Sequence, residues 1–201
     1  MLLQPRTMGI NASKLAAQAD FNNNRVNLYV INIDGLLVTY HVDGFGKWAG
    51  ADLFPGGLRF DRQSGITAGP RYGTTITDVF AVTCDGSLSV IPLDLPPNES
   101  ILIGFGFPPE AYLATDQQNG IEGTLLAAVN NDGAITVTAT GTTGSWGGPN
   151  PLSEGSLFKP GAGVAMDVYH TETLADDATV IYAVDNAGAV QVFIVRKDVD
   201  A

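Results

Sequence analysis

The sequence predicts an all-β fold built from a unit that occurs four times. Four segments each hold two strand-like runs separated by a turn signal, the turn glycines recur at nearly even spacing, and helix signals are nearly absent. At 201 residues, the chain is long enough for one domain with a well-buried core, or for two small domains at most.

The repeated segments are rich in valine, isoleucine, leucine and aromatic residues, the composition typical of strands. They are VNLYVINIDGLLVTYHV from Val26, TDVFAVTCDGSLSVIPL from Thr77, GTLLAAVNNDGAITVTA from Gly123 and ATVIYAVDNAGAVQVFI from Ala178. In each segment an apolar run meets an Asp-Gly or Asn-Ala-Gly break, and a second run with alternating side chains follows. We therefore expect four β-hairpins.

The breaks contain Gly35, Gly86, Gly133 and Gly188. Asp or Asn near Gly supplies the positive backbone angles that a tight hairpin turn requires. The aspartates could instead bind calcium, but no segment has the alternating Asp-x-Asp-x-Asp ladder of a dedicated calcium loop. The pattern favours turns.

Two further features recur with the same period. Trp48 follows Gly35 at the same spacing as Trp146 follows Gly133, and each tryptophan lies inside a Gly-x-Trp-x-Gly stretch. An aromatic residue and a proline precede another short apolar stretch in FPGGLRFDRQ, FPPEAYLATDQ and FKPGAGVAMDVYH. Each unit therefore has four predicted strands: one after the proline, two in the hairpin and one near the tryptophan position.

Units of about 40 to 50 residues with four antiparallel strands are typical of β-propeller blades. We expect one small propeller domain over residues 1–201, with blades at 12–54, 57–106, 109–158 and 162–201, the last completed by residues 1–8. The N-terminal strand would then close the ring and remove the exposed sheet edges.

The segment ASKLAAQAD, residues 12–20, has the composition of a helix. It aligns with the first strand of the other blades, so we predict a strand there.

Composition limits the classes of partner. The net charge is −11, from 21 acidic and 10 basic side chains. Proteins that bind nucleic acids or anionic membranes usually do so through clusters of lysine and arginine. No apolar run approaches the ~20 residues of a membrane helix, and the N-terminus lacks a secretory signal pattern. We expect no nucleic-acid partner and no membrane insertion, and a cytoplasmic chain unless a signal was removed or export takes another route. The lone cysteine, Cys84, is expected as a small buried hydrophobe.

Repeats of the type TDVFAVTCDGSLSV, followed by GSWGGPNPL and a Pro-Gly step, resemble the bacterial and fungal lectin-like β-propellers, which include tectonin-like, tachylectin-like and fucose-binding proteins. The resemblance runs from about Leu2 to Val195. It implies sugar binding in shallow pockets repeated around the ring, usually between neighbouring blades. The fucose-binding pockets of this group combine an Arg, a Glu and an aromatic residue. That set does not recur here, because Arg59, Arg62 and Arg71 all lie in one blade, so fucose specificity is not expected.

Sugar recognition needs a flat aromatic face and polar groups that hydrogen-bond hydroxyl pairs. The candidate ligand-binding residues are Trp48, Trp146, Tyr72 with its neighbour Arg71, and Tyr169 with its neighbour His170. A tryptophan at a fixed blade position can equally pack between sheets, and both interpretations of the tryptophans stay open. The second blade has Glu99 at the tryptophan position, so we expect two good sites rather than four.

Catalytic and metal-binding motifs are absent from the sequence. His41 and His170 are the only histidines, at non-equivalent positions, and there is no Cys partner for a Cys-His or zinc site. Nucleophilic Gly-x-Ser-x-Gly and phosphate-binding Gly-x-x-x-x-Gly-Lys-Ser/Thr motifs are missing. We therefore expect no catalytic residue, no metal and no cofactor.

A glycoside hydrolase needs only two carboxylates about 5 to 9.5 Å apart. The spacing selects no pair among Asp61, Asp116, Asp167 and Glu172.

Three functions are consistent with these observations. The first is a non-catalytic, lectin-like propeller that binds glycans through repeated shallow sites. The second is a structural or protein-docking propeller without sugar binding, in which the tryptophans belong to the core. The third is a propeller glycoside hydrolase. Self-association of the chain stays open under each of them.

Overall fold

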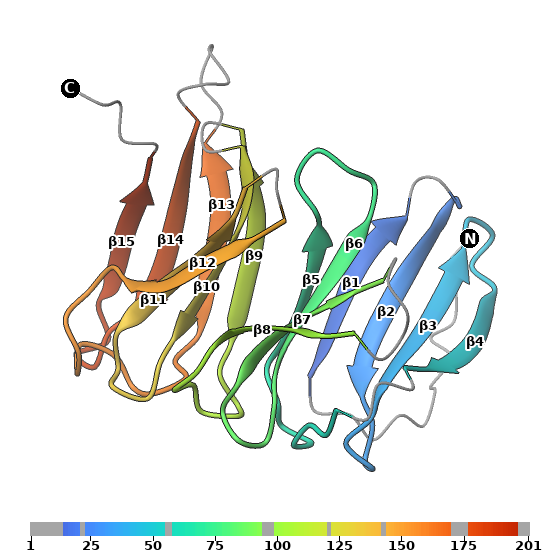
Figure 1. Cartoon of the computed structure of the whole chain (residues 1–201), viewed down its shortest axis with the longest axis horizontal. Helices are drawn as coiled ribbons and strands as arrows, with labels where there is room; N and C mark the ends of the chain where they lie inside the picture. Colours follow the sequence, from blue (N-terminus) through green and yellow to red (C-terminus); the bar gives the residue numbers. More distant parts are fainter. Residues whose placement is uncertain are drawn as a thin grey trace.

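The computed structural model describes residues 14–20, 23–54, 58–93, 99–119, 122–141, 144–169 and 177–196. Within these ranges the chain forms only strands, turns and irregular connections, which confirms the all-β class. The strands form four antiparallel sheets that stand in a row in chain order (Figure 1). The described residues include no helix with the length and apolarity needed to cross a membrane.

In every sheet the strand order follows the chain, so each strand pairs with its sequence neighbour. The first sheet contains β1 (Leu15–Asp20), β2 (Arg25–Ile31), β3 (Leu37–Asp43) and β4 (Trp48–Leu53). The second contains β5 (Ile66–Pro70), β6 (Thr77–Val82), β7 (Leu88–Pro92) and β8 (Ile101–Gly104). The third contains β9 (Leu113–Gln118), β10 (Gly123–Val129), β11 (Ile135–Thr140) and β12 (Trp146–Pro151). The last contains β13 (Val164–Tyr169), β14 (Ala178–Val184) and β15 (Val190–Val195).

The described part of the helix-like segment at the start of the first sheet forms the strand β1, as predicted. β1 pairs with β2 from Leu15 opposite Val30 to Asp20 opposite Arg25. This pairing buries Ala16 in the core. Tertiary pairing thus overrides the helix propensity of the alanines, which is a weak preference.

The four turn glycines lie at hairpin tips, as predicted. Their φ angles are 73°, 80°, 73° and 83° at Gly35, Gly86, Gly133 and Gly188. These are left-handed backbone conformations that glycine adopts without a steric penalty. Among the described residues, no group of three or more His, Cys, Asp or Glu side chains is placed to hold a metal ion.

In three of these turns, a polar side chain shortly before the glycine accepts hydrogen bonds from the turn backbone. The sequence pattern did not predict these bonds. The Oδ1 atom of Asn32 accepts hydrogen bonds of 2.9 Å from the backbone N–H groups of Asp34 and Leu36. Asn130 and Asp185 accept equivalent pairs of bonds in the third and fourth hairpins. Such local bonds stabilise turns at the expense of continued strand.

The second hairpin corrects the expectation for Cys84. Its side chain is exposed, because the residue belongs to the turn between β6 and β7 and not to the buried strand before it.

Each of the first three hairpin turns also hydrogen-bonds to the chain segment that leads to the next sheet. The backbone N–H groups of Phe60, Phe107 and Phe158 donate to the carbonyls of Gly35, Gly86 and Gly133. All three phenylalanines are buried. The structure therefore assigns Phe60, rather than Phe54 of the Phe-Pro pair, to the repeat position that Phe107 and Phe158 occupy.

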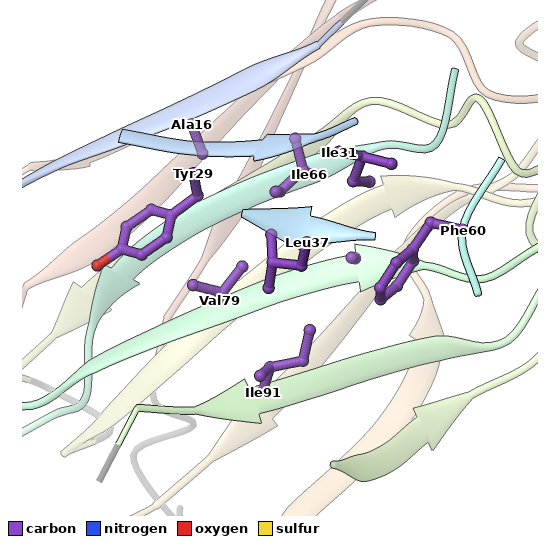
Figure 2. Packing of buried hydrophobic residues seen from close by; sticks show 9 residues of the cluster. Ala16, Tyr29, Ile31, Leu37, Phe60, Ile66, Val79 and Ile91 are labelled. Atoms are coloured by element: carbon purple, nitrogen blue, oxygen red, sulfur yellow. The ribbon is translucent and has the colours of Figure 1, made fainter. Parts of the chain in front are cut away.

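The core lies between the sheets, in three clusters at the three junctions. Figure 2 shows the first, where Tyr29 and Leu37 from the first sheet meet Val79 and Ile91 from the second. Each sheet between two others is apolar on both faces, since both faces are covered. Burial of these faces is the main stabilising contribution to the fold.

The row of sheets does not close on itself in the described part of the chain. The last sheet stands at one end and the first sheet at the other (Figure 1), and the last sheet has three described strands where the others have four. The strand predicted from residues 1–8 lies outside the described residues.

Candidate functional site

A small pocket lies at the junction of the second and third sheets. It encloses about 90 Å³ and is lined by Arg71, Asp78, Val90, Pro92, Ile101, Thr140, Gly144 and Trp146. The first five residues come from the second sheet or its turns, and the last three come from the third sheet or its turns. The pocket therefore exists only because two neighbouring repeats pack face to face.

The polar side of the pocket is an ion pair within the second sheet. Arg71 follows β5 and Asp78 lies near the start of β6, so the hairpin that joins these strands brings the two side chains together. The Nη2 atom of Arg71 donates to Oδ1 of Asp78 at 2.7 Å, and its Nε atom donates to Oδ2 at 3.1 Å. The Asp78 side chain is 3% exposed and the Arg71 side chain 25% exposed. The buried carboxylate thus holds a planar guanidinium that still reaches the surface.

The apolar side of the pocket is the indole of Trp146. This residue opens β12, pairs with Thr140 of β11, and is half-buried. Its ring packs edge-on against Phe80 of the second sheet. Trp146 therefore belongs to the core and lines the pocket, so the two interpretations of this tryptophan are not exclusive.

This arrangement provides the two elements that sugar recognition requires. An indole face can pack against the apolar C–H side of a sugar ring. An oriented guanidinium and a carboxylate can hydrogen-bond neighbouring hydroxyls. Nothing in the pocket resembles a nucleophile activated by a base, since its titratable side chains are those of Arg71 and Asp78.

The structure brings together two of the six candidate residues, Arg71 and Trp146. Tyr72 is half-buried, and its backbone N–H donates to Oγ1 of Thr124 at 2.9 Å, which ties the β5–β6 turn to the third sheet. Its side chain does not line the pocket. Tyr72 supports the site through its backbone position.

The remaining candidates lie elsewhere. Trp48 occupies the same repeat position as Trp146, opposite Val42 of β3, but is 41% exposed, and no sheet precedes its own among the described residues. Tyr169 ends β13 and is exposed. His170 lies outside the described residues.

Asp78 is the pocket residue that the sequence-based prediction missed. It is 2% exposed at the start of a strand that is otherwise buried and apolar. A single acidic residue in an apolar run could have indicated this role, because a buried carboxylate needs a partner that hydrogen-bonds to it or carries the opposite charge. The pocket therefore contains one Arg, one acid and one aromatic residue, although this set does not recur around the repeats.

The acidic residues considered for hydrolysis are spread over the fold. Asp116 is half-buried in β9, Asp167 is exposed in β13, and Asp61 is exposed in the connection before β5. Glu172 lies outside the described residues.

A wider hollow of about 450 Å³ lies beside the β6–β7 turn, where Arg59, Thr83, Asp85 and Ser87 line it. Hydrogen bonds from Thr83 and Ser87 hold the pKa of Asp85 below its usual value. This hollow has no aromatic side chain in its lining, so it offers no flat apolar face to a sugar ring.

Comparison with known proteins places this geometry in context. No protein-family model and no curated protein matches the chain. Among solved structures, the BP39L lectin from Burkholderia pseudomallei is 30% identical and superposes with a TM-score of 0.80 over 94% of this chain and 54% of that one. The chain therefore has the fold of this lectin over nearly its whole length.

More distant lectins share this fold. AofleA from Arthrobotrys oligospora is 15% identical, with a TM-score of 0.66 over 91% of this chain and 53% of that one. The Aleuria aurantia lectin, a six-bladed β-propeller, is also 15% identical, with a TM-score of 0.59 over 92% and 61% of the two chains. The chain thus spans about half to three-fifths of the length of these lectins.

Proposed function

We propose that this lectin-like propeller is a non-catalytic carbohydrate-binding module, and that it binds glycans in the pocket formed by Arg71, Asp78 and Trp146. The observation that carries the proposal is the convergence of these side chains from two neighbouring sheets. A half-buried indole stands beside a guanidinium that a buried carboxylate orients.

The neighbouring structures support this proposal and suggest the first ligand to test. SapL1 lectin, which is 15% identical with a TM-score of 0.63 over 91% of this chain, was solved in complex with α-methyl fucoside. The combination of an arginine, an acid and an aromatic residue in one pocket makes an α-fucoside the first choice for this chain as well. Its occurrence at one junction predicts a single site of this type within the described residues.

The test is titration of the protein with α-methyl fucoside and with a panel of other monosaccharides, followed by tryptophan fluorescence and calorimetry. We expect weak saturable binding, with dissociation constants of about 0.1 to 1 mM, on the order of −4 to −5.5 kcal/mol. Immobilised glycans should retain the protein more strongly if several copies bind together.

Matched tryptophan variants locate the site. Trp146→Ala should abolish binding, whereas Trp48→Ala should leave it unchanged, since Trp48 belongs to the first sheet and does not line the pocket. Circular dichroism would confirm that both variants fold. Absence of binding by every glycan at millimolar concentration would refute the proposal, as would full binding by the Trp146 variant.

We also propose the finer architecture that the sequence predicts, one domain over residues 1–201 in which the N-terminal residues complete the last blade. The last sheet, in which three strands are described, supports it, since each of the other sheets has a fourth strand at its outer edge. Deletion of residues 1–8 should then lower stability and expose the edge of β15, which hydrogen exchange of the β15 amides would detect.

A protein-docking role is the second candidate. The observation that favours it is the set of exposed apolar side chains on the last sheet.

A further inference from the structure

The wider hollow beside the β6–β7 turn has a volume of about 450 Å³, in the range of small-molecule sites. It is built from the second sheet and from the connection that leads into that sheet. Arg59 comes from the connection, Cys84 and Asp85 come from the turn, and Ser89 comes from β7. None of these four side chains lines the pocket of Trp146, so the hollow is independent of that pocket.

Cys84 lines this hollow, and its side chain is exposed. The repeat fixes the backbone at its position, two residues before the turn glycine. The N–H of Cys84 donates to the carbonyl of Arg59 at 3.5 Å. The N–H groups of Asn131 and Asn186 donate equivalent bonds of 2.8 and 3.1 Å to the connections before their own sheets. Cys84 is therefore a nucleophilic sulfur that solvent reaches and that the fold holds in a defined place.

Arg59 places a positive charge at the same hollow. The Nη1 atom of its exposed side chain donates to the carbonyl of Asp34 in the first hairpin turn, at 2.9 Å. This bond orients the guanidinium and uses one of its donors, so its other N–H groups are available to a ligand. Guanidinium groups pair with carboxylates through two parallel hydrogen bonds. The hollow can therefore bind a carboxylate beside the Cys84 thiol.

Asp85 places a negative charge at the hollow. Its Oδ1 atom accepts hydrogen bonds from the Thr83 hydroxyl and, at 3.1 Å, from the backbone N–H of Ser87. These bonds hold the pKa of the carboxyl below its usual value, so it is ionised at neutral pH. A ligand with a carboxylate alone would be repelled by Asp85, whereas a ligand that also carries an ammonium group would pair with Asp85 as well as with Arg59. The two charges thus fit the zwitterion of an amino acid.

Ser89 adds a buried hydroxyl without a partner. The residue is 4% exposed and lines the hollow, and its hydroxyl makes no hydrogen bond to any described residue. Thr136 stands at the equivalent position of the third sheet, and its hydroxyl donates to the carbonyl of Ala128 at 3.3 Å. Buried polar groups usually have a partner, because leaving one unpaired costs free energy. The unpaired hydroxyl of Ser89 therefore indicates a polar ligand group in the hollow.

We propose that the hollow is a thiolation site, in which Cys84 forms a mixed disulfide with an amino-acid or short-peptide thiol that carries both a carboxylate and an ammonium group. Arg59 binds the carboxylate, and Asp85 binds the ammonium group. The hydroxyl of Ser89 hydrogen-bonds to an amide or carbonyl group of the ligand. The volume of about 450 Å³ accommodates a tripeptide such as glutathione as well as a single cysteine.

The reaction is a thiol–disulfide exchange with a low-molecular-weight disulfide of that class. The Cys84 thiolate attacks one sulfur of the disulfide, a new S–S bond forms to Cys84, and the original S–S bond breaks. Cys84 is oxidised, and the half of the disulfide that leaves is reduced to a thiolate, which takes up the proton that Cys84 released. Excess reduced thiol reverses the step. The modification therefore responds to the ratio of disulfide to thiol around the protein.

A ratio of reaction rates tests whether the hollow recognises the ligand. The full chain is treated with oxidised glutathione and, separately, with hydroxyethyl disulfide, which carries no charge, and mass spectrometry follows the adduct on the Cys84 peptide. The ratio of the two rates cancels the reactivity of the sulfur itself, because the same thiolate attacks both reagents. This ratio should be about threefold higher or more in the folded protein than in the urea-unfolded chain. Equal ratios would overturn the proposal, since Cys84 would then be an ordinary exposed thiol.

Matched variants test the assigned contacts. Arg59→Gln and Ser89→Ala should each lower the ratio of the folded protein towards that of the unfolded chain. The control is Arg62→Gln, which removes the same charge from the same connection, because Arg62 does not line the hollow. This control should keep the wild-type ratio, and circular dichroism would confirm that all three variants fold. If either hollow variant keeps the wild-type ratio, or if the control loses as much as Arg59→Gln, the proposal is wrong.

Discussion

The indole of Trp146 stands edge-on to the ring of Phe80, with centroids 5.4 Å apart and an interplanar angle of 77°. One side chain thus joins two sheets and lines the pocket between them. Trp146→Ala should lower the free energy of unfolding by about 2 kcal/mol, since full burial of such a ring is worth about 3 to 5 kcal/mol and this one is half-buried. Denaturant unfolding followed by circular dichroism measures the loss. Trp146→Phe should recover much of the stability, and an alanine variant as stable as wild type would contradict the assigned packing.

The Arg71–Asp78 pair should matter both for stability and for ligand binding. Arg71→Ala leaves the 3%-exposed Asp78 carboxylate without the two hydrogen bonds it receives from the guanidinium, so we expect a loss of about 3 kcal/mol. The double replacement Arg71→Met and Asp78→Leu should restore most of the stability, because apolar side chains of similar size remove the buried charge as well. Calorimetry should still find no fucoside binding by the double variant. Binding that survives in it would exclude the pair from the site.

Glycine replacements separate backbone strain from close packing. Gly86→Ala and Gly188→Ala place a Cβ atom at φ angles of 80° and 83°, which costs about 1 to 2 kcal/mol in either case. Only at Gly86 would the Cβ atom also meet the Phe107 carbonyl, at 2.6 Å. Thermal unfolding should therefore show the larger loss for Gly86→Ala. Equal losses would mean that the turn does not press against the connection.

Alkaline pH should destabilise the first core cluster through Tyr29. Burial raises the pKa of its phenol to about 12, above the ordinary value of 10. The folded state favours the neutral phenol, so this contribution to stability is present below pH 10 and is lost as the pH rises from 10 to 12. Denaturant unfolding across this interval should show a steeper decline for wild type than for Tyr29→Phe. Parallel declines would show that Tyr29 titrates as an ordinary surface tyrosine.

Much of the fold was predictable because the repeat encodes it locally. The turn glycines and the alternating runs around them identified the hairpins, and the position of residues 12–20 in the repeat identified a strand that composition disguised. The placement of Cys84 was wrong, since the boundary between a buried strand and its turn depends on a few residues. The sequence pattern assigned Phe54, and not Phe60, to the repeat position of Phe107 and Phe158. Both residues precede β5, and only the hydrogen bond from the Phe60 backbone N–H to the Gly35 carbonyl distinguishes them.

The candidate site was predicted in part. The pattern of aromatic and basic residues beside glycine-rich turns identified Trp146 and Arg71. It did not identify Asp78, and it did not show which candidate residues lie together in the pocket. Partners in the pocket come from different repeats, as Asp78 and Trp146 do, and no local pattern links them.

The sequence by itself determined the all-β class, the positions of the hairpins and the equivalence of Trp48 and Trp146, because periodicity and turn chemistry act over a few residues. The tertiary structure alone decided that these equivalent tryptophans differ. The environment of a side chain on a sheet face depends on the sheet that covers that face. Trp146 lies beside Phe80 and Arg71 of the preceding sheet. Trp48 has no preceding sheet among the described residues. The same repeat position thus lines a pocket between two sheets at Trp146 and is partly exposed at Trp48.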